Sequence, residues 1–204
     1  MDEKVNAIKK WLGTGSINLF GEPFSGKDTQ GEQLAKMFSA KLISGGSILR
    51  SLKESEEIKQ SIGSGNLAPA DFYLKSVLPY LGKSEFSNYP LVLSSVGRLE
   101  GEEVPTIEAA DRSGHTMKAA IWLQLSEDEV WKRFDKSKSL NDRGKRQDDT
   151  KEALRVRLKR FASDTIPVLN YYDDHNLLIK IDGSPSTEDV TEKIIDSLYN
   201  FINN

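Results

Sequence analysis

Residues 21–30 form a turn rich in glycine and serine, set directly between a short apolar run and a helical pattern. A strand, loop and helix in this order point successive backbone N–H groups and the positive end of the helix dipole at one small volume, which suits a polyphosphate. Gly21 and Gly26 can adopt positive φ and let an anion approach the main chain, while Lys27 adds a mobile cation. This stretch predicts an α/β fold built around a phosphate-binding loop.

The loop departs from the general phosphate-loop pattern at one position. That pattern places Ser or Thr directly after the lysine, whereas here Asp28 holds this position and the hydroxyl follows at Thr29. A carboxylate beside phosphates is electrostatically unfavourable unless it points away from them. A polar surface turn rich in glycine and serine is therefore the alternative interpretation.

Composition excludes several classes of protein. The 204 residues suffice for one substantial domain with inserted subdomains, and 37% hydrophobic residues suit a buried core. A net charge of −3, with Lys and Arg spread along the chain, disfavours a nucleic acid polymer as partner. The absence of cysteine excludes disulfides and thiolate zinc sites, and we interpret the only histidines, His115 and His175, as ordinary surface residues. Neither a signal peptide nor an apolar run of roughly 20 residues is visible, so we expect a cytoplasmic protein without a membrane partner.

Short strand-like runs alternate with longer helical patterns along the chain. This alternation predicts a five-stranded, mostly parallel sheet with helices on both faces and with ligands at the carboxyl ends of the strands. The predicted strands are residues 17–20, 41–43, 90–93, 118–125 and 177–181. A short N-terminal helix comes first, and Ser186 is the expected N-cap of the last helix. The other predicted helices are residues 30–38, 47–52, 71–81, 106–112, 126–136, 150–172 and 186–202.

The ordered motifs resemble those of the adenylate kinase family of nucleoside monophosphate kinases, a family with a P-loop NTPase-type fold, from about residue 17 to residue 195. The family loop, of the form G-x-P-G-x-G-K-G-T-Q, has its hydroxyl at the position of Thr29, and the departures are Phe24 and Asp28, where glycine is usual. The resemblance implies that ATP binds at Gly21, Phe24, Ser25, Gly26, Lys27, Asp28, Thr29 and Arg133.

The same resemblance implies a site for the acceptor monophosphate. Residues 43–50 match the family segment I-S-T-G-D-M-L-R, and residues 65–69 resemble the turn whose main chain holds the acceptor base. Arg50 and Arg98 would clamp the acceptor phosphate. The complete set implied for this site is Gly45, Arg50, Asn66, Leu67, Ala68, Ser95, Arg98 and Glu102.

A group of arginines in the second half of the chain also matches the family. In the family, the arginines at the positions of Arg146 and Arg157 bridge the transferring phosphoryl group, and the one at Arg133 reaches the donor nucleotide. Arginine suits this task because its planar fork stays charged and donates paired hydrogen bonds to the negative charges that phosphoryl transfer gathers. Surface pairing with Asp148, Asp149 and Glu152 is the alternative for Arg146, Arg155 and Arg157. The implied catalytic residues are Lys27, Arg98, Arg133, Arg146 and Arg157.

Several departures bear on metal and substrate choice. Ser94 replaces an aspartate that orders water around Mg²⁺ in the family, so we expect Mg²⁺ to be held by ATP phosphates and water near Ser94 and Thr29, with no dedicated protein site. Glu102 replaces a glutamine that reads adenine, and an ionised carboxylate, which only accepts hydrogen bonds, suits guanine better. Gly45 stands where a base-side threonine is usual, and Ser137 where a further lid arginine is usual.

We therefore expect one monomeric kinase domain, residues 1–204, that transfers the γ-phosphoryl group of ATP, with Mg²⁺, to a nucleoside monophosphate, with AMP as the leading acceptor. A GMP or CMP kinase, or a nucleotide-binding regulatory protein without catalysis, are the alternatives. The expected core comprises residues 15–43, 75–136 and 150–204, the NMP-binding insertion residues 44–74, and the short lid residues 137–149.

Overall fold

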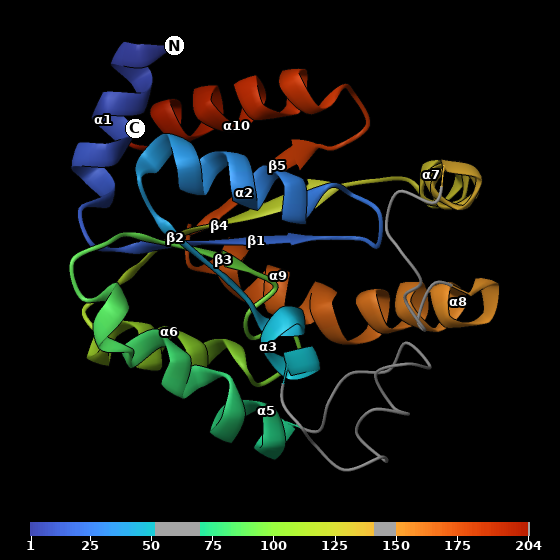
Figure 1. Cartoon of the computed structure of the whole chain (residues 1–204), viewed down its shortest axis with the longest axis horizontal. Coiled ribbons are helices and arrows are strands. Elements are labelled where there is room, and N and C mark those ends of the chain that lie inside the picture. The colour runs from blue at the N-terminus through green and yellow to red at the C-terminus, as the bar shows by residue number, and fades with distance from the viewer. Residues whose placement is uncertain (52–69, 141–149, 204) are drawn as a thin grey trace.

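The computed structural model describes residues 1–51, 70–140 and 150–203 (Figure 1). Its centre is one five-stranded sheet in the order β2-β3-β1-β4-β5, and every neighbouring pair of strands is parallel. This arrangement confirms the predicted fold class and all the predicted strands. The strands are β1 (Ser16–Gly21), β2 (Lys41–Ser44), β3 (Leu91–Ser94), β4 (Met117–Gln124) and β5 (Leu178–Asp182).

Helices cover both faces of the sheet (Figure 1). On one face lie α1 (Asp2–Leu12), α2 (Lys27–Phe38) and α10 (Thr187–Phe201). On the other lie α3 (Gly45–Ser51), α5 (Ala70–Ser76), α6 (Glu103–Arg112) and α9 (Ile166–Asp174), with short 3-10 turns at Leu78–Gly82 and Ser84–Phe86.

The central strand β1 is buried on both faces, as expected for a parallel sheet between two helical layers. Ile17 and Leu19 belong to the hydrophobic core beneath α1, α2 and α10, whereas Phe20 belongs to the core on the opposite face. This strand therefore fixes the phosphate loop that follows it between two packed layers.

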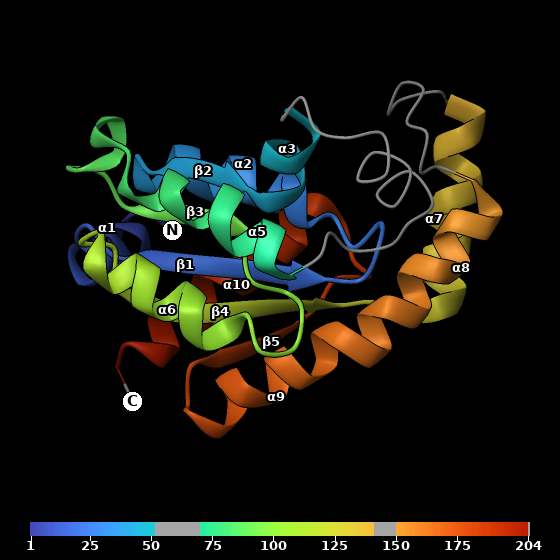
Figure 2. The same ribbon diagram turned by 90° about the horizontal axis from the view of Figure 1, so that it is seen from below.

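A third, smaller hydrophobic cluster lies beyond the end of the sheet. It joins α7 (Glu127–Leu140) to α8 (Lys151–Arg160), and these two helices form the end of the molecule opposite both termini (Figure 2). Its buried residues are Leu125, Val130, Phe134 and Leu154, with Phe24, Trp131 and Leu158 packed against them. Because Phe24 belongs to the phosphate loop, this cluster connects the loop with the helix pair.

The helix predicted for residues 150–172 is continuous but not uniform. An α-helical start at α8 passes through a π-helical turn, Phe161–Thr165, into α9. Pro167 lies in the first turn of α9, and since proline has no N–H to donate, the hydrogen-bond ladder must change just before it. The predicted N-cap is confirmed, because the Ser186 hydroxyl accepts a hydrogen bond from the Asp189 N–H at 3.2 Å.

Several helix boundaries differ from the predicted ones. Helix α2 begins at Lys27 and not at residue 30, because the loop lysine already belongs to the first turn. Helix α7 continues to Leu140, four residues into the expected lid, residues 137–149. The helix predicted for residues 71–81 is two shorter pieces, α5 and a 3-10 turn.

The interpretation of His115 as a surface residue is wrong. Its side chain is 1% exposed, and its Nδ1 atom lies 2.8 Å from the backbone carbonyl oxygen of Thr14. Because a carbonyl only accepts, Nδ1 carries the proton in this contact. Gly114, with φ of 78°, turns the chain back after α6 and carries His115 beneath the start of β1.

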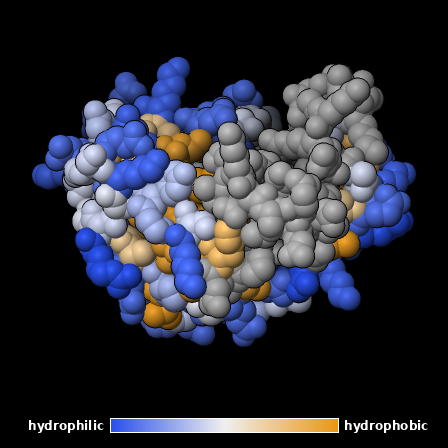
Figure 3. All heavy atoms as spheres, turned by 60° about the horizontal axis from the view of Figure 1, so that its bottom comes forward, coloured by the Kyte–Doolittle hydropathy of each residue, from blue (hydrophilic) through white to orange (hydrophobic). Residues whose placement is uncertain are grey.

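On the face shown in Figure 3, the described residues present a mainly polar surface, with hydrophobic side chains in small areas between charged ones. Within the part of the chain that the structure describes, the large hydrophobic residues with substantial exposure are Met1, Tyr89 and Val104. None of the described helices combines the length and the apolar character that a membrane crossing requires.

Candidate nucleotide-binding site

The phosphate loop uses positive φ at Phe24 and Gly26, with φ of 64° and 85°. The prediction for Gly26 is confirmed, and it forms the N-cap of α2. The prediction for Gly21 is wrong, because it does not adopt positive φ. Gly21 is required for space instead: a Cβ there would lie 2.8 Å from the Leu123 carbonyl oxygen and would collide with the Ser25 hydroxyl.

Phe24 takes a backbone conformation that normally selects glycine. A left-handed conformation costs an L-residue about 1–2 kcal/mol. The Phe24 ring packs edge-on against the buried Phe134 ring of α7, with 5.6 Å between centroids and an interplanar angle of 88°. This contact offsets part of the strain and attaches the loop to α7.

A groove of about 820 Å³ opens beside the loop on the side of α7 and α10. It is lined by loop residues, by polar residues of α7 and by the turn between β5 and α10. Its volume and its position at the carboxyl ends of the strands suit a nucleotide. The lining residues are Phe24, Gly26, Lys27, Asp28, Thr29, Glu129, Lys132, Arg133, Lys136, Ser137, Ser184, Pro185, Ser186 and Thr187.

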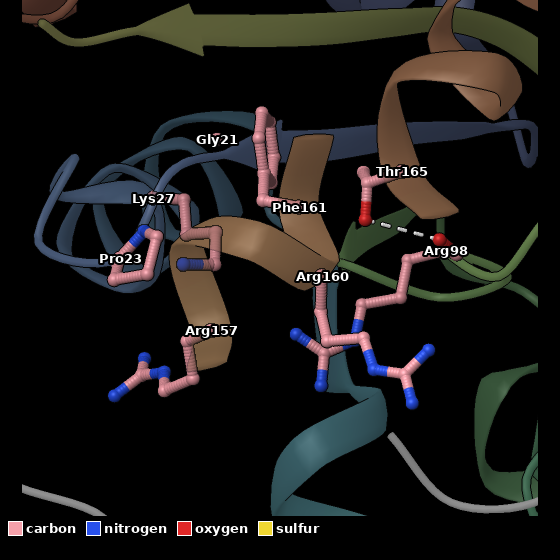
Figure 4. Close-up of a pocket in the computed structure, with 8 residues that line it drawn as sticks. All are labelled: Gly21, Pro23, Lys27, Arg98, Arg157, Arg160, Phe161 and Thr165. Atoms are coloured by element: carbon pink, nitrogen blue, oxygen red, sulfur yellow. Dashed lines mark hydrogen bonds between the residues drawn. The ribbon is translucent and has the colours of Figure 1, made fainter. Parts of the chain in front are cut away.

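A small hollow of about 20 Å³ lies on the other side of Lys27 (Figure 4). Four cationic side chains from three separate segments surround it: Lys27 from the loop, Arg98 from the segment after β3, and Arg157 and Arg160 from α8. The Thr165 hydroxyl donates to the backbone carbonyl of Arg98 at 3.1 Å and connects the π-helical turn with that segment. The hollow therefore concentrates positive charge beside the phosphate loop.

Arg133 joins three segments around the groove. Its Nε donates to Glu129 at 3.2 Å, one terminal nitrogen donates to the Phe24 carbonyl at 3.3 Å, and the other donates to the carbonyls of Gly183 and Ser184 at 2.8 and 2.9 Å. The guanidinium thus lines the groove, but its hydrogen bonds hold the phosphate loop and the turn after β5 against α7.

On the acceptor side, Gly45 and Ser95 lie next to Tyr73. A Cβ on Gly45 would meet the Tyr73 hydroxyl oxygen at 2.8 Å and the Ser95 carbonyl oxygen at 3.1 Å. That hydroxyl accepts a hydrogen bond from the Gly97 N–H at 2.8 Å, and burial raises the pKa of Tyr73. The tyrosine therefore fills the space that a larger side chain at position 45 would need.

Glu102 is brought under the segment that begins with Arg98. Its side chain is 3% exposed, and its carboxylate accepts a hydrogen bond from the Leu99 N–H at 3.0 Å. Burial raises its pKa to about 7, although the charge of Arg98 acts in the opposite direction. In this arrangement the carboxylate stabilises the turn to which it belongs. Its position therefore gives no support to a role in recognising the acceptor base.

Ser94, where β3 ends, contacts the phosphate loop directly. Its hydroxyl donates to a carboxylate oxygen of Asp28 at 2.8 Å, and the Ser94 side chain is 2% exposed. Among the described residues, no group of three or more His, Cys, Asp or Glu side chains is arranged to hold a metal ion. The Ser25 hydroxyl is buried and has no hydrogen-bond partner in the described part of the chain.

Two charged residues of the site were not predicted from the sequence. Arg160 lines the cationic hollow, and its position one turn after Arg157 is the signal that could have identified it. Glu22, at a variable position of the loop motif, accepts hydrogen bonds from Trp122 Nε1 at 3.4 Å and from the Leu125 N–H at 3.1 Å. Burial raises its pKa. Nothing in the motif pointed to this connection between the loop and the end of β4.

Five of the predicted site residues have side chains that lie outside the part of the chain that the structure describes. Arg50 belongs to α3, but its side chain is outside what the structure describes. The remaining predicted residues outside the described ranges are Asn66, Leu67, Ala68 and Arg146.

A phosphate loop between β1 and α2, an adjoining groove and a cationic hollow define a P-loop nucleotide-binding protein of the α/β class. The family model for adenylate kinase matches residues 19–177, which is more than half of the chain. The chain therefore belongs to the adenylate kinase family and is a phosphotransferase.

Individual relatives agree with this assignment over nearly their whole length. The adenylate kinase of Flavobacterium johnsoniae is 29% identical over 196 residues, covering 91% of this chain and 98% of that protein. Adenylate kinase 1 of a Nostoc species is 30% identical over 185 residues, covering 85% and 93%. The adenylate kinase of Petrotoga mobilis is 28% identical over 214 residues, covering 89% and 96%.

Proposed function

We propose that this protein transfers the γ-phosphoryl group of ATP reversibly to AMP and yields two ADP molecules. The observation that carries this proposal is the position of Lys27, which lines both the large groove and the cationic hollow. A donor nucleotide in the groove would direct its terminal phosphate toward the hollow, where the acceptor phosphate meets it. The bond between the bridging oxygen and the γ-phosphorus breaks, and a new bond forms to an oxygen of the acceptor phosphate.

The residues of the loop bind the donor in this proposal. The main chain near Gly26 and the start of α2 face the phosphates with N–H groups, and Lys27 neutralises part of their charge. The Thr29 hydroxyl and the side chain of Arg133 lie along the same groove. Because Arg133 already holds the loop by hydrogen bonds to carbonyl groups, it acts on the donor mainly through its charge and by positioning the loop.

The hollow stabilises the charge that develops during transfer. Arg98 holds the acceptor phosphate, and Arg157 and Arg160 of α8, which line the same hollow, stabilise the transferring group. Preorganised cations at such a position lower the barrier without a general base or a covalent enzyme intermediate. Arg50 and Arg146 complete the set by resemblance to the family.

Mg²⁺ accompanies ATP in this proposal. The hydroxyl of Thr29 and the pair of Asp28 and Ser94 offer the oxygen donors that Mg²⁺ and its bound water prefer, so the described residues fit the metal. When bound to the phosphates, Mg²⁺ neutralises negative charge on them and orients them.

AMP remains the proposed acceptor because the curated relatives are adenylate kinases and because the buried position of Glu102 does not favour guanine. We place the protein in the cytoplasm as a monomer. A nucleotide-binding regulatory protein is the alternative function, and it would bind ATP without transferring phosphate.

The test is ADP formation from ATP and Mg²⁺, with AMP, GMP, CMP and UMP offered separately. We expect turnover that is fastest with AMP and that falls by about 10³-fold or more in Lys27→Met. Equal rates in the wild type and Lys27→Met would contradict the proposed mechanism. ATP binding without transfer to any of the four acceptors would favour the regulatory protein.

A further inference from the structure

Asp28 is an acidic residue within the donor groove, next to the loop lysine. It lines the groove together with Lys27 and Thr29, and it is the second residue of α2. Its carboxylate accepts a hydrogen bond from the Ser94 hydroxyl at 2.8 Å, so the end of β3 holds the Asp28 side chain in place. Ser94 is itself 2% exposed, which makes this contact an internal feature of the site.

A fixed carboxylate at this position opposes the binding of a bare polyphosphate. ATP without metal brings several negative charges into the groove, and at separations of a few ångströms the repulsion from Asp28 is substantial. A divalent cation on the phosphates reverses the sign of this interaction, because the carboxylate then faces a local excess of positive charge. The same side chain thus penalises metal-free ATP and favours the metal complex.

Ser94 increases the difference in affinity between metal-free ATP and the metal complex. The hydroxyl has one proton, which it donates to Asp28, and its oxygen keeps its capacity to accept from water. Carboxylates that bind Mg²⁺ through its water molecules are usually fixed by such neighbouring groups. Resemblance to the adenylate kinase family leads one to expect an aspartate at position 94. Ser94 takes its place, and the carboxylate that its hydroxyl contacts belongs to Asp28.

We propose that Asp28, held by Ser94, makes the donor groove selective for Mg²⁺-bound ATP over metal-free ATP. This inference rests on the proposed function, since it takes ATP as the ligand of the groove. It assigns to Asp28 a role as a positioning and selectivity residue that is separate from the transfer of the phosphoryl group.

The experiment is isothermal titration of the full chain with ATP, once with excess EDTA and once with Mg²⁺. The quantity to compare is the ratio of the two dissociation constants, metal-free over Mg²⁺-bound. Asp28→Asn keeps the shape and an oxygen that accepts from Ser94 but removes the charge. We expect it to bind metal-free ATP more tightly and Mg²⁺-ATP more weakly, which lowers the ratio by about tenfold.

Three further variants distinguish an effect of the Asp28 charge on ATP binding from an effect of altered structure. Glu188→Gln removes an exposed acid from the first turn of α10, outside the groove lining, and should leave the ratio unchanged. Ser94→Ala keeps the carboxylate but removes its hydrogen bond from the Ser94 hydroxyl, and should lower the ratio by about threefold. The double variant Asp28→Gly with Ser94→Asp transfers the carboxylate from position 28 to position 94. It should restore most of the wild-type ratio.

A purely structural role for Asp28 would change both affinities in the same direction and leave the ratio as it is, and that result overturns the inference. A ratio that falls in Asp28→Asn but also in Glu188→Gln overturns it too. If the wild type binds neither form of ATP, the proposed function itself is wrong, and this inference falls with it. Wild-type binding with an unchanged ratio in Asp28→Asn leaves the proposed function intact and rejects only the role of Asp28.

Discussion

Burial of the Glu102 carboxylate should make the stability of this protein depend on pH. Its pKa in the folded protein is about 7, above the ordinary value of 4.5. Between these values the folded state retains a proton that the unfolded state has lost. The free energy of unfolding therefore falls as the pH rises from 4.5 to about 7, and it stays at the lower value above pH 7.

The size of the effect follows from the same two values. A difference between 4.5 and about 7, at about 1.4 kcal/mol per pH unit, corresponds to at most about 3.5 kcal/mol. Arg98 opposes the rise in pKa and Glu103 adds to it, while Tyr73 is neutral throughout this range. Glu102→Gln keeps an oxygen that accepts from the Leu99 N–H but cannot ionise. The variant should exceed the wild type in stability by about 2–3 kcal/mol at pH 8 and match it near pH 4.5.

Urea unfolding, followed by tryptophan fluorescence at several pH values between 4.5 and 8, measures this difference. Glu100→Gln, at an exposed position in the same loop, is the matched control and should follow the wild type at every pH. A difference between Glu102→Gln and the wild type that is the same at pH 5 and pH 8 would refute the reasoning, because the carboxylate would then titrate alike in the folded and unfolded states.

Three other predictions concern the loop, the acceptor side and the hollow. Phe24→Ala should be about 1 kcal/mol less stable than Phe24→Gly, because only glycine accepts the left-handed backbone without strain; urea midpoints that place alanine above glycine would contradict this. Tyr73→Phe should lose about 1–3 kcal/mol in the same assay, since it leaves the buried Gly97 N–H without its acceptor, and an unchanged midpoint would exclude that contact as stabilising. Arg160→Ala should lower kcat by about tenfold or more, with partial recovery in Arg160→Lys; an unchanged kcat would place Arg160 outside the reaction.

The sequence was sufficient to predict the parts of the fold that depend on local pattern. Each strand is a short apolar run, and the alternation with helices determines a parallel sheet. The position of Lys27 after a glycine-rich turn was equally local, and its placement at the groove follows from the strand–loop–helix order. These features depend on residues that are neighbours in the chain.

The remaining features depend on contacts between distant segments. The bond between Asp28 and Ser94 requires that β3 lie beside β1, which no local pattern specifies. Phe24 at positive φ could not be anticipated, because phenylalanine is unfavourable there until its ring meets Phe134 of α7. His115 is buried by the turn after α6, and the polar residues that precede it in the chain do not predict this burial.

The hydrogen bonds of Arg133 have a consequence for the energetics of nucleotide binding. One guanidinium already connects the phosphate loop, α7 and the turn after β5, so the opposing walls of the groove are fixed to a common point before any ligand arrives. Much of the conformational entropy that a looser groove would lose on binding has been lost during folding. If the groove holds the nucleotide as proposed, its described lining is preorganised, and the affinity depends on how well the ligand fits a width that the protein has already set.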